Sequence, residues 1–104
     1  MTINGKTHRA DLKIIGDQII GDWWRLEGHA LQEPDIADIL VAPVEVLVVG
    51  TGDSGRMEVT RPAARAVERQ GIQLLALPTA QAVGVFNALR TQGKRVAGAF
   101  HLTC

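Results

Sequence analysis

The sequence predicts a single small α/β domain, with a mixed central sheet, an N-terminal hairpin and a β-α-β-α-β second half. Its 104 residues, 46% of them hydrophobic, are enough for one core, so we expect one domain over residues 1–104. Three apolar runs of strand length alternate with two helical periodicities in the second half, behind shorter apolar runs at the front. Right-handed crossovers would make the three later strands parallel neighbours and leave the hairpin at an edge.

The front of the chain predicts a hairpin and a third strand. Residues 12–15 and 18–20 flank a Gly-Asp pair, and Gly readily adopts the positive φ that two-residue hairpin turns need. A second Gly-Asp pair precedes a predicted strand over residues 23–26, with one indole facing inward and the other outward. Residues 27–34 are predicted to form a loop.

A short helix and a central strand are predicted next. Apolar residues recur at i, i+3 and i+4 over residues 36–40, so Asp35 is the expected N-cap and Pro43 ends the helix. Residues 44–49 are almost all β-branched or apolar, which is typical of a strand covered on both faces. Residues 50–60 are predicted to form a long loop, and long loops are often functional.

The second half continues with helix, strand, helix and strand. Pro62 suits a first helical turn and Gly71 suits a C′ position, so a helix is expected between them, followed by a buried strand over 72–77. Thr79 is the expected N-cap of a helix that ends near Gly93. The inward-facing residues of the two helices are predicted to be Ala63, Ala66 and Val67, then Ala82, Val85, Phe86 and Leu89. Residues 95–102 form the last predicted strand.

Charge and cysteine content exclude several classes of function. Eleven Lys and Arg balance eleven Asp and Glu, so no global field attracts nucleic acid or anionic lipid. Weak charge repulsion is compatible with a homo-oligomer. Cys104 is the only cysteine, which excludes an internal disulfide and favours a reducing compartment. With neither an apolar leader nor a membrane-length apolar run, we expect a cytoplasmic protein.

One stretch matches a dinucleotide-binding fingerprint. Residues 50–55 read G-x-G-x-x-G directly after an apolar strand. The fingerprint requires its glycines to open a helix, yet the five residues 56–60 intervene before the helix that starts near Pro62. The acid that should bind the ribose is also missing, because Leu77 and Pro78 end the next strand. We therefore predict no cofactor, and interpret the glycines as positions of positive φ or close backbone approach.

Metal binding and catalysis find little support. The His and Cys residues lack the repeated close spacing of a zinc site, so no metal is predicted; they are His8, His29, His101 and Cys104. Cys104 beside His101 could act as a nucleophile, but a packed or exposed terminal thiol is the simpler interpretation. Asp53 and Ser54 could act as an acid and a nucleophile. Asp and Ser are also common in turns, where their side chains form local hydrogen bonds, and this is the preferred interpretation. No catalytic residue is assigned, and enzymatic activity stays uncertain.

An ordered set of short pieces resembles a known family. The pieces include VLVVGTG at 46–52, Gly71-Ile72, Gln81-Ala82, FNAL at 86–89, and FHLTC at 100–104, with Trp24-Arg25 and Gly28-His29 further forward. Together they resemble the domain-of-unknown-function family that contains the adipogenesis-associated cytoplasmic protein of animals and mitochondrial respiratory complex I assembly factor 3. The likeness is greater to the cytoplasmic branch.

The resemblance implies a compact α/β fold with a cleft near the glycine loop and no established reaction. The positions that match the family's cleft pattern are Gly50, Thr51, Gly52, Thr79, Asn87 and Arg95. Two departures put any chemistry of that cleft in doubt: Phe86 stands where the family often has Tyr, and Pro78 where many members carry an acid.

The leading functional hypothesis is a non-catalytic binding or regulatory module with a protein partner, which an exposed Trp23 or Trp24 indole would contact. The alternative is a small-molecule carrier or enzyme that binds a small anionic ligand, with Arg56 or Arg95 as the clamp. Its candidate cleft residues are Gly50, Thr51, Gly52, Asp53, Ser54, Arg56, Thr79, Asn87 and Arg95. A plain scaffold subunit would instead need a large apolar patch.

Overall fold

The computed structural model describes residues 2–3, 6–26 and 28–102, and its centre is a five-stranded mixed sheet. The strand order is β4-β3-β9-β6-β8. The strands are β3 (Leu12–Ile15), β4 (Gln18–Ile20), β6 (Val46–Thr51), β8 (Gln73–Leu77) and β9 (Val96–His101). The predicted fold class, a small α/β domain with a mixed sheet, is confirmed.

The sheet has a parallel half and an antiparallel half. β6 pairs in parallel with both β8 and β9, as the right-handed crossovers of a β-α-β-α-β unit require. The hairpin of β3 and β4 joins antiparallel to β9, with Ile14 opposite Gly98. Its Gly16 has a φ of +60°, the conformation expected at this turn. The predicted hairpin and its place at one edge are confirmed.

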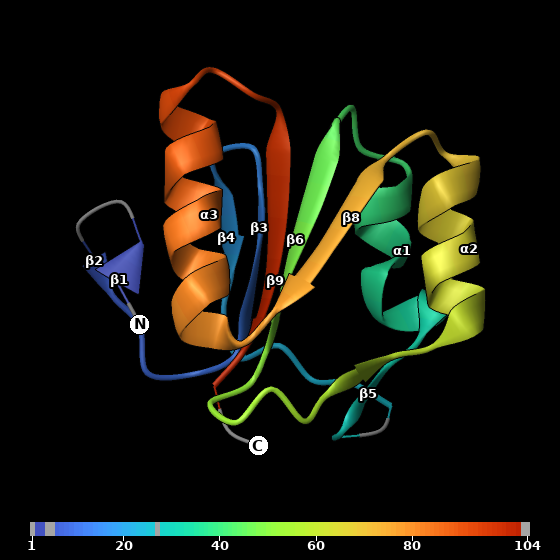
Figure 1. The fold of residues 1–104 in the computed structure, drawn as a ribbon, viewed down its shortest axis with the longest axis horizontal. Helices are drawn as coiled ribbons and strands as arrows, with labels where there is room; N and C mark the ends of the chain where they lie inside the picture. Colours follow the sequence, from blue (N-terminus) through green and yellow to red (C-terminus); the bar gives the residue numbers. More distant parts are fainter. Residues whose placement is uncertain (1, 4–5, 27, 103–104) are drawn as a thin grey trace.

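Helices cover both faces of the sheet (Figure 1). On one face lies α3 (Thr79–Thr91); on the other lie α2 (Arg61–Arg69) and α1 (Ala37–Leu40), the latter preceded by the 3-10 helix η1 (Glu33–Ile36). Thr60 caps α2 by accepting the Ala63 N–H, and Gly71 follows the helix with a φ of +73°. No helix in the described part of the chain is both long and apolar enough to cross a membrane.

Two small sheets lie outside the central one. β1 (Thr2–Ile3) and β2 (Lys6–Thr7) form an antiparallel pair, and β5 (Ala30–Leu31) runs parallel to β7 (Glu58–Val59). The second pair joins the two segments that the sequence predicts to be loops, 27–34 and 50–60. Two-residue strands are too short to leave a period-2 signal, which explains why sequence patterning misses them.

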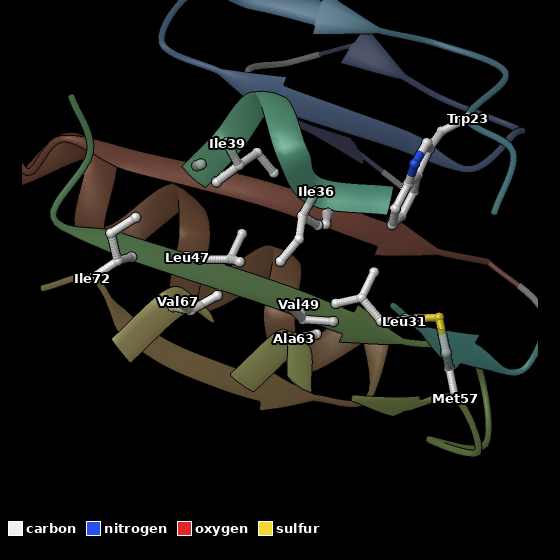
Figure 2. Close-up of a cluster of buried hydrophobic side chains, with 12 residues drawn as sticks. Trp23, Leu31, Ile36, Ile39, Leu47, Val49, Met57, Ala63, Val67 and Ile72 are labelled. Carbon is white, nitrogen blue, oxygen red and sulfur yellow. The ribbon is translucent and has the colours of Figure 1, made fainter. Parts of the chain in front are cut away.

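The core has two layers, one on each face of the sheet. Leu47 and Val49 point to the layer under α1 and α2, where Figure 2 shows Trp23 at one end near Ile36. The other layer lies under α3 and contains Phe86 and Phe100, whose rings meet edge to face with centroids 5.5 Å apart. Alternate residues of β6 thus supply both layers, as expected for a central strand.

Four local predictions are wrong. Residues 23–26 form no strand, although one indole is buried and the other exposed as predicted; the buried one is Trp23 and the exposed one Trp24. Asp35 lies inside η1 rather than capping a helix, because its buried carboxylate accepts the N–H groups of Leu26 and Gln32. Pro78, not Thr79, is the N-cap of α3. β8 is an edge strand that stays partly exposed, because no described strand follows it in the sheet.

Candidate functional site

The glycine loop begins where β6 leaves the sheet. Gly50 and Thr51 are the last residues of β6, and Gly52 has a φ of +106° that favours glycine. A Cβ on Gly50 would lie 2.8 Å from Thr79 Oγ1, so close backbone approach is required there. Asp53, Ser54 and Arg56 are all exposed. These glycines serve the packing of β6 against α3, in line with the simpler interpretation of the motif.

Thr79 ties three elements together at this end of the sheet. Its backbone N–H donates to Gly52 O at 3.0 Å, and its Oγ1 accepts the Gly52 N–H at 2.8 Å. The same hydroxyl donates to the carbonyl of His101 in β9. With only 5% of its surface exposed, Thr79 joins α3 to the ends of β6 and β9. The hydroxyl is therefore fully used by the fold.

A cavity of about 480 Å³ lies beside the glycine loop. Its lining residues are Thr2, Asp53, Thr79, Ala80, Val83, Gly84 and Leu102. Asn87, one turn beyond Val83 on α3, places its Nδ2 3.5 Å from the carbonyl oxygen of Thr2, while its Oδ1 is buried with no described partner. Of the predicted cleft residues, the structure thus brings Asp53 and Thr79 to one cavity, with Asn87 close by.

The predicted arginine clamp is not at this cavity. Arg95 precedes β9, whereas the glycine loop follows β6, and these two strands are parallel, so Arg95 lies at the opposite end of the sheet. There its N–H donates to Glu45 Oε2 at 3.0 Å, and it lines a separate cavity of about 450 Å³ together with Arg90 and Lys94. Arg56 does not line the glycine-loop cavity either. The structure therefore divides the predicted cleft set between two ends of the molecule.

Sequence reasoning missed a charged cluster around Asp11. The side chains of Arg25 and His101 are only 5% and 6% exposed. Asp11 Oδ2 lies 2.8 Å from Arg25 Nη1 and 2.7 Å from His101 Nδ1, and Asp11 Oδ1 accepts the Leu102 N–H at 2.8 Å. His101 Nδ1 is also 2.8 Å from Arg25 Nη2, so one His101 tautomer donates to Asp11 and the other accepts from Arg25.

The environment of Asp11 favours its charged form. Burial acts to raise the pKa of its carboxyl, but hydrogen bonds from His101, the Leu102 N–H and Arg25 outweigh burial. The pKa of Asp11 is therefore lowered from its usual value of 3.8. A carboxylate that is ionised at neutral pH and bound to two basic side chains holds a segment in place and does not supply a proton.

Trp23 extends this cluster to a second ion pair. The Arg25 guanidinium lies 5.0 Å from the centre of the Trp23 ring system and Lys13 Nζ lies 5.7 Å from it, both within cation–π range. Lys13 in turn donates to Asp38 at 2.8 and 2.9 Å. The indole thus contacts two cations, and each cation is paired with a carboxylate, Asp11 for Arg25 and Asp38 for Lys13.

The outer side of the cluster is a cavity with an exposed tryptophan at its rim. The cavity holds about 330 Å³, and its lining includes Asp11, Asp22, Trp24 and Arg25. Trp24 is 88% exposed and Leu26 is 71% exposed. Asp22 has a φ of +49°, and it is the only non-glycine residue with a positive φ among the described residues. We call the exposed pair, Trp24 and Leu26, the Trp24 surface.

Neither metal binding nor the terminal thiol gains support. Within residues 2–3, 6–26 and 28–102, no group of three or more His, Cys, Asp or Glu side chains is placed to hold a metal ion. Cys104, the alternative nucleophile, lies outside the described residues. His101 contributes to the Asp11 cluster instead.

Comparison with protein families identifies the chain. The family described as "Protein of unknown function (DUF498/DUF598)" matches residues 1–101. The chain therefore belongs to this family. The predicted membership in a domain-of-unknown-function family is confirmed.

Solved structures of similar proteins share the fold. A conserved hypothetical protein from Pyrococcus horikoshii is 25% identical, with 99% of this chain and 91% of that one covered and a TM-score of 0.76. A protein described as an outer membrane protein from Bartonella henselae is 23% identical, with 97% and 85% covered and a TM-score of 0.78. A Xanthomonas campestris protein is 23% identical, with 95% and 74% covered and a TM-score of 0.79. None of these descriptions assigns an activity.

Proposed function

We propose that this member of the DUF498/DUF598 family is a non-catalytic binding module that holds a protein partner at the Trp24 surface. The observation that carries the proposal is that Trp24 and Leu26 are exposed, whereas Trp23 and the side chain of Arg25 are buried. Exposed apolar patches mark interaction sites, whereas single exposed apolar residues are ordinary, and Trp often dominates the binding energy of such patches. We place this binding in the cytoplasm, in line with the single cysteine.

The backbone on either side of Trp24 is fixed by hydrogen bonds. The Trp23 N–H donates to Asp11 O at 3.0 Å, and the Leu26 N–H donates to Asp35 Oδ1 at 3.1 Å. Arg25 is held by Asp11 and donates to Gly28 O at 3.1 Å. A segment that is ordered before binding loses little conformational entropy on association. This anchoring supports a binding role over an accidental exposure of the indole.

The neighbouring cavity supports the same role. At about 330 Å³ it has room for a side chain of a partner, and Trp24 stands at its rim. Interface hot spots commonly combine an aromatic anchor with an adjacent pocket from which water is excluded. We expect the partner to cover the indole and to place one side chain in this cavity.

Affinity capture from an extract of the source organism tests the proposal. The wild-type protein should retain a partner that Trp24→Ala loses. Val41→Ala is the matched control, because Val41 is an equally exposed apolar residue, at 86%, on the separate segment after α1. Retention of the same proteins by all three baits, or none by any, would contradict the proposal.

The second candidate is a small-molecule carrier or enzyme that uses the glycine-loop cavity. The buried Oδ1 of Asn87 beside that cavity, which has no partner among the described residues, is the observation that favours it. The lining carries the Asp53 carboxylate and no arginine, which favours a ligand rich in hydrogen-bond donors over the anion expected from the sequence. A thermal-shift screen against metabolites should then give a stabilisation that Asn87→Ala abolishes without loss of the fold. If Asn87→Ala unfolds the protein, Asn87 is structural.

A further inference from the structure

The outer edge of β8 is open for pairing. β8 ends the five-stranded sheet, with β6 on one side and no strand of the described chain on the other. Figure 1 shows the sheet from this side, with β8 crossing in front of its neighbours. An edge strand presents backbone N–H and C=O groups that a further strand can pair with.

The backbone hydrogen bonds of β8 show which of its residues direct their N–H and C=O groups to the outer edge of the sheet. The Gln73 N–H donates to Glu45 O at 2.9 Å, and the Thr79 N–H, six residues on, donates to Gly52 O at 3.0 Å. Both bonds run toward the β6 side. Because alternate residues of a strand direct their backbone groups to opposite edges, Leu74 and Ala76 direct theirs outward.

Neither charge nor proline protects this edge. Residues 73–89, which include all of β8 and most of α3, contain no Asp, Glu, Lys, Arg or His, in a chain that is 21% charged. Proteins commonly blunt an edge strand by shortness, charge or proline. The opposite edge follows this rule, because β4 has three residues and lies between Asp17 and Asp22. β8 has five residues and none of these devices.

The uncharged surface continues from the edge onto α3. Leu75 and Leu77 are half-buried against the second core layer, which Val85 of α3 also joins. The exposed residues of α3 before Arg90 are Ala80, Gln81, Gly84 and Ala88. Depletion of charge distinguishes the centre of a protein interface from ordinary surface.

We propose that β8 pairs with β8 of a second copy of this chain, antiparallel about a two-fold axis at Leu75. In this register Leu74 of one subunit exchanges both backbone hydrogen bonds with Ala76 of the other, and the two-fold axis repeats the exchange. Leu75 then faces Leu75 of the partner subunit. The two sheets become one continuous sheet across the dimer.

The properties of the β8 edge favour a second copy of this chain as the pairing partner. A two-fold interface places each patch against itself, so a charged edge would bring like charges together, and this edge has none. The zero formal net charge of the chain adds no long-range repulsion. The proposed hydrogen-bond ladder between the two copies of β8 also has defined ends. Pro78 has no N–H to donate at one end, and at the other end the Ile72 N–H already donates to Val67 O at 3.2 Å.

Sedimentation velocity over a wide concentration range tests the association. The wild type should sediment as a dimer, and Ala76→Pro should sediment as a monomer, because proline removes an outward N–H and leaves the β6 ladder intact. Ala76→Val is the matched control and should remain a dimer, since it keeps that N–H. A monomeric wild type at every concentration, or dimeric Ala76→Pro, would overturn the proposal.

Cross-linking tests the register and does not depend on the proline variant folding. In a Cys104→Ser background, Leu75→Cys would place two thiols at a non-hydrogen-bonded pair, with Cα atoms about 4.5 Å apart, within disulfide range. Gln73→Cys would place them about 13 Å apart, four residues along the strand. We expect rapid disulfide dimerisation for Leu75→Cys alone. Equal rates for both variants, or no cross-link for either, would refute the register.

Discussion

Arg25 and His101 lie 76 positions apart in the chain, yet a nitrogen of each reaches the same carboxylate oxygen, Asp11 Oδ2, at 2.8 and 2.7 Å. The contact joins the last residue of β9 to the segment that presents Trp24. It therefore links the sheet to the proposed binding surface.

Loss of the Asp11 carboxylate should destabilise the protein. Asp11→Asn leaves the buried Arg25 guanidinium without its counter-charge, and we expect a loss of roughly 2–4 kcal/mol in the free energy of unfolding. Asp17→Asn is the control, because Asp17 pairs with Arg90 while fully exposed and should cost less than about 1 kcal/mol. Urea denaturation measures both. Equal effects would mean that the Asp11 cluster contributes no more than a surface pair.

The same cluster should make stability depend on acidic pH. The pKa of Asp11 is lower in the folded protein than its usual 3.8, so ionised Asp11 contributes stability that is fully present above that value. This contribution is lost as the pH falls below 3.8 toward the folded-state pKa. The difference in unfolding free energy between wild type and Asp11→Asn should therefore shrink between pH 7 and pH 3. A difference that stays constant with pH would exclude ionised Asp11 as its source.

Two glycine substitutions should have opposite effects. A Cβ on Gly98 would lie 2.7 Å from Phe100 Cζ and 3.1 Å from Phe86 Cδ1, so Gly98→Ala overpacks the core at a cost of about 1–3 kcal/mol. Gly84 lies in the exposed part of α3 with nothing within 4 Å of an added Cβ. Gly84→Ala should stabilise by roughly 0.5–1 kcal/mol through helix propensity. Thermal denaturation of the two variants checks both signs.

The hydroxyl of Thr79 should matter to stability more than that of a surface threonine. Thr79→Val leaves the Gly52 N–H and the His101 carbonyl without their shared partner, which should cost roughly 2–3 kcal/mol. Thr91→Val removes one exposed bond, to Asn87 O at 2.9 Å, and should stay within about 0.5 kcal/mol. Equal losses in a chemical denaturation series would show that Thr79 does not hold α3 to the sheet.

The sequence predicted most of the fold because local patterns carry it. The apolar run at β6, the helical periodicities of α2 and α3, and the turn glycines Gly16 and Gly71 each act over a few residues. The errors occur where side chains from distant segments decide the local structure. Ion pairs and cation–π contacts, rather than strand pairing, determine the conformation of the segment at Trp23. Asp35 accepts a hydrogen bond from the Leu26 N–H across the loop instead of capping a helix.

The sequence alone determined the α/β class, the order of the five central strands and the main helices, and the buried faces of those helices, since periodicity and turn chemistry are properties of neighbouring residues. Only the tertiary structure decided which charged residues meet. It brought Asp11, Arg25 and His101 together and separated Arg95 from the glycine loop. The contact of Asp11 with Arg25 and His101 depends on how a segment without regular secondary structure packs against the end of β9, and no local pattern in one sequence encodes such packing.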